Sequence, residues 1–447
     1  MPTTRPADRP AADALPVPQD SLVGSRFEMT VGPVAHGGHC VGRLDGRVVF
    51  VRHALPGEVV TVGVTRGRSA DRFLFADAVQ VHSPSPHRVN PPCRYAGPGG
   101  CGGCDFQHVD LDEQRRWKGG VITEQLARLA GLHVPVLVEP VPGDDHGLRW
   151  RTRVQFAVDR HGAAGLHPHH CRTVLPIEDC LIARQEVSAE ILRRRYPGSS
   201  AVEVALSSAG ERSVVVLPQG RRRTERIHET VRVGPDSWTF RLNAASFWQV
   251  HPGLAAVLVD AVRSGLRPRP GERALDLYSG VGVFARALAD AVGPDGAVLA
   301  VEADPRAVRA AQEWATGETG GDHVVQVRAG RVEATLRGLV AGGDRVDLVV
   351  LDPPRAGSGR AVVADLTALR PRAICYVACD PAALARDTAD LVAAGYTLAD
   401  LRAFDAFPMT QHVECVAVFT DTPDRQARTS RPAGPPPSDR DGAAPRH

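Results

Sequence analysis

The C-terminal part of the chain alternates between short apolar runs and segments with helical periodicity. Residues 274–278, 297–301, 347–351 and 373–378 each have the length and composition of a buried strand. Helical patterns separate these runs, as at residues 284–291. Strands that alternate with helices build parallel sheets, so this part predicts an α/β domain with a doubly wound, Rossmann-like sheet.

The N-terminal part has a different pattern, in which short alternating runs are separated by glycine turns. Residues 27–31, 47–51 and 58–62 alternate between apolar and polar side chains, and Pro56-Gly57 forms a turn before the last of them. Such spacing predicts a small β-barrel, although an unspecific β module fits the pattern equally well.

The stretch between these two parts combines both periodicities. Residues 154–158 and 213–217 alternate as strands do, and residues 185–196 repeat as a helix does, which predicts an α+β middle domain. Both ends of the chain have the polar, proline-rich composition of disordered segments. The predicted division is a disordered tail at 1–21, an OB-like barrel at 22–82, a middle domain at 83–242, the α/β domain at 243–421 and a second disordered tail at 422–447.

The composition indicates the cellular compartment of the protein more than its function. The chain has 447 residues, and its 53 basic and 51 acidic residues are too evenly balanced to indicate a partner. No apolar run reaches the length of a membrane-spanning helix, so we expect no membrane association. The N-terminus lacks the apolar core of a signal peptide, and nine cysteines without an export signal favour a reducing, cytoplasmic compartment.

Three of the nine cysteines are clustered. Cys101 and Cys104 are separated by two glycines, and Cys93 lies upstream of them. Thiols at this spacing can reach one metal centre, and a fourth ligand would come from Cys171 or Cys180. The pattern fits an iron–sulfur cluster or a closed zinc site; the simpler alternative is a loop of unligated thiols.

Another cysteine, Cys379, stands where an apolar run ends and a helical pattern begins. Asp380-Pro381 marks the start of that helix. Ligands of open α/β sheets bind at the carboxyl ends of strands, and the positive end of a helix would favour a reactive thiolate there. A buried structural cysteine is the alternative, because free cysteine is commonly buried.

The turn Gly280-x-Gly282 follows the first strand of the α/β domain, and Glu302 closes the second. An acid at that position pairs with the ribose hydroxyls of a bound nucleotide. The third glycine of the dinucleotide fingerprint is missing, which disfavours a pyrophosphate and favours an adenosyl ligand such as S-adenosylmethionine. A flavodoxin-like fold without a cofactor is the alternative.

Several segments together resemble one known family. Residues 36–58 are similar to the TRAM domain, an OB-like RNA-binding barrel. Asp352-Pro353-Pro354-Arg355, Cys379-Asp380-Pro381 and residues 407–414 occur in the order found in the RNA uracil-5 methyltransferases, whose members make 5-methyluridine in ribosomal or transfer RNA. The resemblance covers roughly residues 21–420.

The resemblance implies roles for individual residues. Cys379 would be the nucleophile and Glu414 the base. Cys180 is preferred to Cys171 as a cluster ligand because it lies where the last ligand of the family falls. Four departures from the family pattern are present. The spacing between Cys93 and Cys101 is long, Asp380 and His251 stand where the family usually has asparagine, and Val283 replaces a polar residue after the glycine turn. The implied cofactor residues are Gln249, Tyr278, Glu302 and Asp352, and the implied ligands of a [4Fe-4S] cluster are Cys93, Cys101, Cys104 and Cys180.

These residue types suit methylation of uracil. Carbon 5 is a poor nucleophile until a thiolate adds at carbon 6, and the carbon-5 proton then needs a base. We therefore expect an RNA (uracil-5-)-methyltransferase that acts on RNA, ribosomal more than transfer RNA, with no evident obligate protein partner. The rivals are a non-catalytic RNA-binding iron–sulfur protein with a methyltransferase-like domain and an iron–sulfur redox protein.

Overall fold

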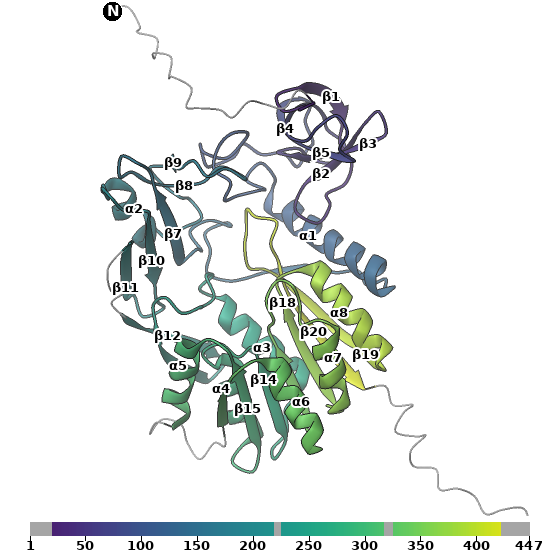
Figure 1. The fold of residues 1–447 in the computed structure, drawn as a ribbon, viewed down its shortest axis with the longest axis vertical. Helices are drawn as coiled ribbons and strands as arrows, with labels where there is room; N and C mark the ends of the chain where they lie inside the picture. The colour runs from purple at the N-terminus through teal and green to yellow at the C-terminus, as the bar shows by residue number, and fades with distance from the viewer. Residues whose placement is uncertain (1–19, 219–224, 317–324, 422–447) are drawn as a thin grey trace, which may run out of the picture.

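The computed structural model describes residues 20–218, 225–316 and 325–421. The tails predicted at 1–21 and 422–447 therefore lie outside the described residues, apart from Asp20 and Ser21. Figure 1 shows a small barrel next to a middle β unit, with a larger α/β domain below both of them. No helix in these ranges is long and apolar enough to cross a membrane.

The α/β domain contains a single sheet of eight strands in the order β16-β15-β14-β17-β18-β20-β19-β6. Neighbouring strands from β16 to β18 are parallel, whereas β20 is antiparallel to both β18 and β19. This arrangement confirms the predicted doubly wound class. Its elements are α3 (Leu254–Leu266), β14 (Arg273–Leu277), α4 (Val283–Val292), β15 (Ala297–Glu302), α5 (Pro305–Thr316), β16 (Val325–Ala329), α6 (Val332–Gly342), β17 (Leu348–Leu351), α7 (Arg360–Ala368), β18 (Ala373–Ala378), α8 (Pro381–Ala393), β19 (Tyr396–Asp405) and β20 (Glu414–Asp421).

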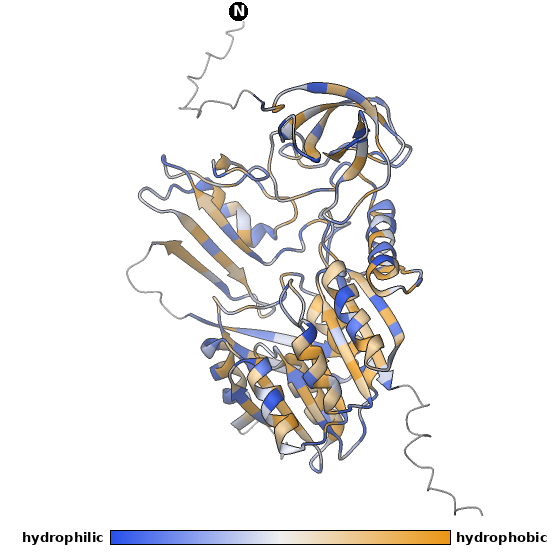
Figure 2. Cartoon of the chain, turned by 45° about the vertical axis from the view of Figure 1, so that its right-hand side comes forward, coloured by the Kyte–Doolittle hydropathy of each residue, from blue (hydrophilic) through white to orange (hydrophobic). Residues whose placement is uncertain are grey.

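The central strands are buried on both faces because helices cover both sides of the sheet. Every residue of β17 and β18 is buried, which explains their continuous apolar runs. Figure 2 shows the same strands as the most hydrophobic part of the domain. Because β14, β15, β17 and β18 are parallel, their carboxyl ends meet at one edge of the sheet.

The barrel is a five-stranded sheet with the order β1-β4-β5-β3-β2. Its interior is filled by alternating side chains such as Val49, Val51, Val60, Val62 and Leu74. The second and fifth strands of the barrel, residues 40–44 and 73–83, were not predicted. In the fifth strand, the continuously apolar run at residues 73–75 hides the alternation. The strands are β1 (Arg26–Thr30), β2 (Cys40–Leu44), β3 (Arg47–Arg52), β4 (Val59–Arg66) and β5 (Phe73–Ser83).

The middle unit contains an antiparallel five-stranded sheet with the order β11-β10-β7-β8-β9 and one helix. A separate hairpin follows it, and Trp238 and Phe240 of this hairpin pack into the core of the α/β domain. The elements are β7 (Arg153–Val158), β8 (Ala164–Leu166), β9 (Leu175–Pro176), α2 (Gln185–Arg193), β10 (Ala201–Leu206), β11 (Arg212–Leu217) and the hairpin strands β12 (Arg226–Val233) and β13 (Asp236–Asn243).

The segment between barrel and middle sheet also packs against the α/β domain. Helix α1 (Leu111–Gln125) continues into the π-helical turn η1 (Leu126–Ala130), and the short strand β6 (Val138–Pro140) pairs in parallel with β19. Ile122 and Leu126 belong to the same apolar cluster as β18. The expected division at residue 242 thus separates elements that share one core, because a core is built by contacts between segments distant in sequence.

Candidate active site

Cys379 and Glu414 lie at the ends of two adjacent antiparallel strands. Cys379 directly follows β18, and Glu414 is the first residue of β20. The last registered pair of this ladder joins Ala378 to Cys415, so the next position on each strand places Cys379 across from Glu414. Asp352 directly follows β17, the other neighbour of β18. The structure thus brings the expected nucleophile and base together.

The electrostatic setting of Cys379 differs from the expectation of a lowered pKa. Burial, reinforced by the charges of Glu414 and Asp352, raises the pKa of the Cys379 thiol to about 11. The N-terminus of α8 is already capped, because the Asp380 carboxylate accepts the Ala383 amide at 2.8 Å. Burial and two acidic neighbours therefore outweigh the dipole of a helix whose N-terminus is already capped.

The carboxyl groups around this sheet edge are also shifted. Burial, followed by the charge of Asp352, raises the pKa of Glu414 well above its ordinary value. Burial likewise raises the pKa of Asp352 to about 7 and that of Asp276 in β14 to about 8. Arg355 opposes the shift at Glu414. Burial at this edge of the sheet thus favours neutral carboxyl groups, and a cation bound beside them would favour their ionised forms.

The glycine turn after β14 has the backbone geometry of a ligand cradle. Tyr278, Gly280 and Gly282 all have positive φ angles, of 61°, 57° and 83°. A Cβ at Gly282 would approach Trp314 to 2.7 Å, so this position requires glycine. Glu302 fastens the turn from β15, with one carboxylate oxygen accepting the Gly280 amide at 2.8 Å.

All six expected catalytic and cofactor residues line one cavity of about 890 Å³. Gln249 reaches it from the segment that precedes α3, together with Phe247, which is 73% exposed. The neighbouring Trp248, by contrast, is buried against Phe240, so only the Phe247 ring faces outward. The catalytic and cofactor residues of this cavity are Cys379, Glu414, Gln249, Tyr278, Glu302 and Asp352.

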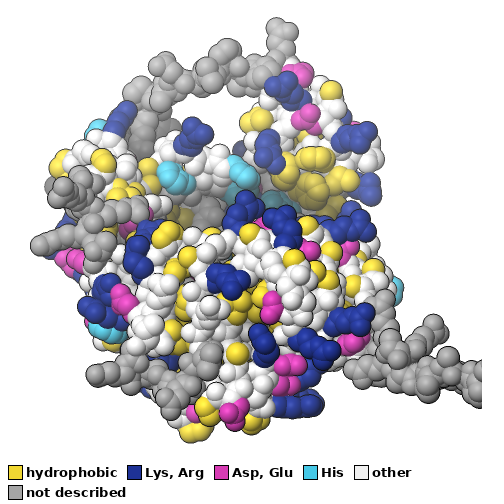
Figure 3. Space-filling model, turned by 60° about the horizontal axis from the view of Figure 1, so that its bottom comes forward, with side chains coloured by type: hydrophobic (Ala, Val, Ile, Leu, Met, Phe, Trp, Pro, Cys, Tyr) yellow, Lys and Arg dark blue, Asp and Glu magenta, His cyan; other side chains and the backbone are white. Residues whose placement is uncertain are grey.

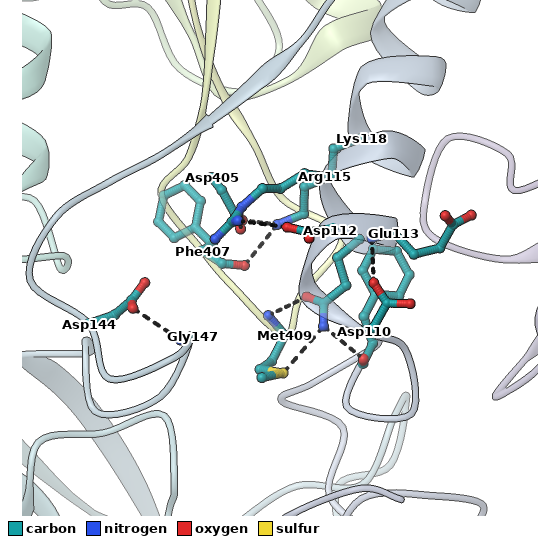
Figure 4. A network of polar contacts seen from close by, with 12 residues as sticks. Asp110, Asp112, Glu113, Arg115, Lys118, Asp144, Gly147, Asp405, Phe407 and Met409 are labelled. Atoms are coloured by element: carbon teal, nitrogen blue, oxygen red, sulfur yellow. Dashed lines mark hydrogen bonds and ion pairs between the residues drawn. The ribbon is translucent and has the colours of Figure 1, made fainter. Parts of the chain in front are cut away.

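Helix α1 holds the segment that leads into Glu414 (Figure 4). Lys118, nearly completely buried, donates to the Asp405 carboxylate at 2.6 Å and to the Phe407 carbonyl at 3.1 Å. Gln114 accepts the Met409 amide at 2.9 Å and also contacts its sulfur. Breaking such a buried ion pair leaves an uncompensated charge, so this contact fixes the path of residues 405–409.

Comparisons with known proteins agree with this geometry. A family model described as tRNA (Uracil-5-)-methyltransferase matches residues 212–422, and a TRAM domain model matches residues 20–79. The 23S rRNA (uracil(1939)-C(5))-methyltransferase RlmD of Chromohalobacter salexigens is 33% identical over 88% of this chain and 90% of its own. The chain belongs to the RNA uracil-5 methyltransferase family. It is accordingly an S-adenosylmethionine-dependent RNA methyltransferase with an N-terminal TRAM domain.

One further relative and one solved structure are similar to this chain. An uncharacterized RNA methyltransferase of Streptomyces coelicolor is 48% identical over 89% of this chain and 93% of its own. The crystal structure of the Pyrococcus abyssi tRNA (uracil-54, C5)-methyltransferase with S-adenosyl-L-homocysteine covers 88% of this chain and all of that one, with a TM-score of 0.62 and 22% identity. That second likeness shows a shared fold.

The four expected cluster ligands of this uracil-5 methyltransferase line a second, smaller cavity between the segment of residues 93–107 and the middle unit. Gln107 joins two of them, since it accepts the Cys93 amide at 3.2 Å and donates to the Cys104 sulfur at 3.4 Å. Cys171 is exposed and does not line this cavity. Among the described residues, no group of three or more His, Cys, Asp or Glu side chains is placed to hold a metal ion.

Several cavity residues were not singled out from the sequence of this methyltransferase. The main cavity is also lined by Arg355, Phe407 and His412, which belong to the family motifs but had no predicted role. His36 was quoted only as part of the barrel motif, yet it lies beside Cys379 in a small adjoining cavity of about 110 Å³. Only the fold brings residue 36 next to residue 379, so the chain order held no signal for it.

His36 links the TRAM barrel to the loop that carries Cys379, and we expect this link to depend on pH. Its Nε2 lies 3.3 Å from Oδ2 of Asp380, and this hydrogen bond raises the pKa of His36. A raised histidine pKa adds stability below its unfolded value of 6.5 and loses it as pH rises through the folded value. The pair is partly exposed, so the contribution should be about 0.2–1 kcal/mol.

Thermal unfolding of His36→Gln and of the wild type at several pH values measures this contribution. The unfolding temperature of the wild type should exceed that of His36→Gln near pH 5.5, and the difference should close toward pH 8. His133→Gln is the matched control, since His133 is exposed and has no ion pair with a described carboxylate. A difference that persists unchanged at pH 8 would contradict the role of the ion pair.

Proposed function

We propose that this protein methylates carbon 5 of a uridine in ribosomal RNA through a covalent bond between Cys379 and carbon 6. The observation that carries the proposal is the position of Cys379 across from Glu414 at the carboxyl edge of the sheet. Both residues line the cavity that also holds the expected cofactor residues. A nucleophile, a base and a nucleotide turn in one cavity match the needs of this reaction.

In the first step, the Cys379 thiolate adds to carbon 6, and the electron pair of the 5,6 double bond moves toward carbon 5 as an enolate. S-adenosylmethionine would supply a methyl group to the enolate carbon 5 and would leave as the neutral thioether S-adenosylhomocysteine. Before that transfer, the positive charge of its sulfonium would favour the ionised forms of a nearby thiol and carboxyl. Glu414 then removes the proton from carbon 5, and the returning electron pair expels the Cys379 thiolate. The uracil ring is restored with one methyl group in place of one proton.

The raised pKa values of Cys379 and Glu414 have one electrostatic cause in common. A half-buried thiol and a buried carboxyl across from each other disfavour two adjacent negative charges. Arg355 lines both cavities that meet at Cys379, and its charge opposes both shifts. A uracil ring must leave its stack to reach these groups, so the target nucleotide would be flipped out of the RNA.

Glu302 would hold the ribose hydroxyls, and its replacement should weaken cofactor binding. Its carboxylate also accepts the amides of Gly280, Ala303 and Asp304, so alanine would disturb the turn as well. Glu302→Gln is the cleaner change. Calorimetry should show S-adenosylmethionine affinity weakened by about 1.5–3 kcal/mol, as for a lost hydrogen bond to a charged group.

Glu313→Gln provides the control for this measurement. Glu313 lies on α5, pairs with Arg226 and does not line the main cavity. Its affinity should equal that of the wild type. Unchanged affinity in Glu302→Gln would mean that the ribose site lies elsewhere in the cavity.

We further propose that Cys93, Cys101, Cys104 and Cys180 hold a [4Fe-4S] cluster. Burial raises the pKa of Cys101 and raises that of Cys180 to about 11, so these thiols would stay protonated without a cation. Each thiolate of such a cluster binds a different iron, and the four sulfurs therefore stand further apart than around one zinc ion. The Gly103 amide and Gln107 already donate to two of the sulfurs. The cluster would serve as a structural support.

Mapping of 5-methyluridine tests the whole proposal. Ribosomal and transfer RNA from cells with and without this protein would be digested and analysed by mass spectrometry. One uridine in ribosomal RNA should lose its methyl group when the protein is absent and regain it with purified protein and S-adenosylmethionine. Loss from transfer RNA alone would overturn the choice of substrate, and no loss in either RNA would overturn the proposed reaction.

A further inference from the structure

Three phenylalanine rings touch one another on the outer face of the barrel. Phe50 of β3 pairs in register with Phe75 of β5, and their ring centroids are 5.4 Å apart. Phe73 lies 5.8 Å from Phe50 and 5.7 Å from Phe75, and it is 48% exposed. Single exposed apolar residues are common, whereas a contiguous group of aromatic rings usually marks a binding surface.

The row of rings continues onto the middle unit. The His39 ring lies 5.7 Å from Phe75, and His169 lies 6.1 Å from His39. The loop of His169 packs on Gly102, where an added Cβ would come within 2.6 Å of the His169 amide nitrogen. Gly102 in turn lines the main cavity. We call the rings of Phe73, Phe75, Phe50, His39 and His169 the aromatic strip. It runs from the barrel to the loop that packs on Gly102, at the lining of the main cavity.

The charges along the aromatic strip suit a polyanion with flat bases. Burial lowers the pKa of His39 to about 4, so this imidazole is a neutral ring at neutral pH. Arg66 stacks on Phe75 at 3.8 Å, is exposed, and makes no ion pair with a carboxylate in the described part of the chain. Figure 3 shows hydrophobic side chains gathered on the barrel and bordered by basic ones.

We propose that the aromatic strip stacks unpaired bases of the substrate RNA that lie next to the target uridine. The inference rests on the proposed function, because the strip ends where the flipped uridine would enter the cavity. Stacking accepts every base, and Arg66 would hold a phosphate beside the stack. The substrate would therefore have to be single-stranded over several nucleotides on one side of the target, and a paired segment there would bind poorly.

A binding measurement with Phe73→Ala tests this proposal. Fluorescence polarisation with a labelled oligouridylate of about 12 nucleotides, within the range bound by one OB fold, reports the affinity. Phe73→Ala should bind about 5- to 150-fold more weakly, which corresponds to one lost stacking contact. An oligonucleotide of equal length with abasic sites should bind the wild type weakly and show no further loss with Phe73→Ala. Arg66→Gln should lower the slope of log affinity against log salt by about 0.7.

Leu137→Ala is the matched control, because Leu137 is 89% exposed and lies before β6, away from the aromatic strip. It should bind the oligouridylate as the wild type does. S-adenosylmethionine affinity should stay unchanged in Phe73→Ala, which shows that the variant folds. Equal oligouridylate affinity in Phe73→Ala and the wild type would overturn the proposal, and reduced self-association in that variant would assign the rings to a protein contact instead.

Methylation of RNA from cells that lack the protein distinguishes failure of the stacking proposal from failure of the proposed function. Activity of Phe73→Ala at saturating RNA should match the wild type, while KM for RNA should rise. If the wild type methylates this RNA and KM does not change in the variant, the stacking proposal alone fails. If the wild type does not methylate any uridine, the proposed function fails.

Discussion

Replacing Cys379 with alanine should reduce uridine methylation below detection, whereas Glu414→Gln should trap a covalent protein–RNA complex. Without the thiol no bond to carbon 6 can form. Without the carboxylate, attack and methyl transfer still proceed, but the carbon-5 proton stays and the thiolate cannot leave. Turnover of Glu414→Gln should fall about 10²- to 10⁴-fold, as for a lost general base. Glutamine has nearly the shape and the neutral charge of the protonated carboxyl that burial favours at this position, so the fold should persist.

A denaturing gel distinguishes the two variants. With RNA and S-adenosylmethionine, Glu414→Gln should give a slowly migrating band, and Cys379→Ala should give none. The double variant should also give none, since the first bond is then missing.

The other cysteines provide the controls for the gel. Cys375 is fully buried within β18, and alanine there avoids burying a hydroxyl group. Cys171 is exposed, so Cys171→Ser leaves the core untouched. The band should remain when either change is combined with Glu414→Gln. A band that persists without Cys379 would identify another nucleophile.

The sequence was informative where a strand end and a helix start leave local marks. Asp380-Pro381 provides both the capping side chain and the proline at the first helical turn, and α8 begins at Pro381 as that signal requires. The continuous apolar run before Cys379 reflects burial on both faces of the sheet. These marks were enough to predict the doubly wound domain and the position of Cys379 at the edge of its sheet.

The side chains that hold the segment before Glu414 in place could not be predicted from the sequence. Helix α1 buries Gln114 and Lys118, so its buried face does not follow the apolar period of a helix. The partners of these two side chains, Met409 and Asp405, lie nearly 300 positions away in the sequence. Such contacts depend on tertiary structure alone. The pKa of Cys379 was predicted in the wrong direction for a similar reason, because its burial and the charges of Glu414 and Asp352 depend on other strands.

The cysteine loop, residues 93–104, is followed by residues that hydrogen-bond to the segment before Glu414. Loss of a proposed cluster ligand should therefore affect iron content and activity together. The amides of Asp105 and Phe106, next to Cys104, both donate to the Met409 carbonyl, at 2.9 and 3.0 Å. Asp105 also accepts the Gln411 amide at 3.1 Å. These bonds run from the cysteine cavity to the segment that precedes Glu414. A collapsed cysteine loop would therefore displace the base without touching Cys379.

Anaerobically purified wild-type protein should be brown and contain about four irons per chain. Cys104→Ser should lose the iron and most of its methylation activity, while iodoacetamide should still modify Cys379. Cys171→Ser is the matched control and should keep both iron and activity, because its thiol is exposed and lies outside the cavity of the four cysteines. Iron that is retained in Cys180→Ser and lost in Cys171→Ser would reassign the fourth ligand. One zinc ion per chain without iron in the wild type would overturn the iron–sulfur proposal and identify a closed zinc site. The hydrogen bonds between the cysteine loop and the segment before Glu414 would then link a zinc site to the base.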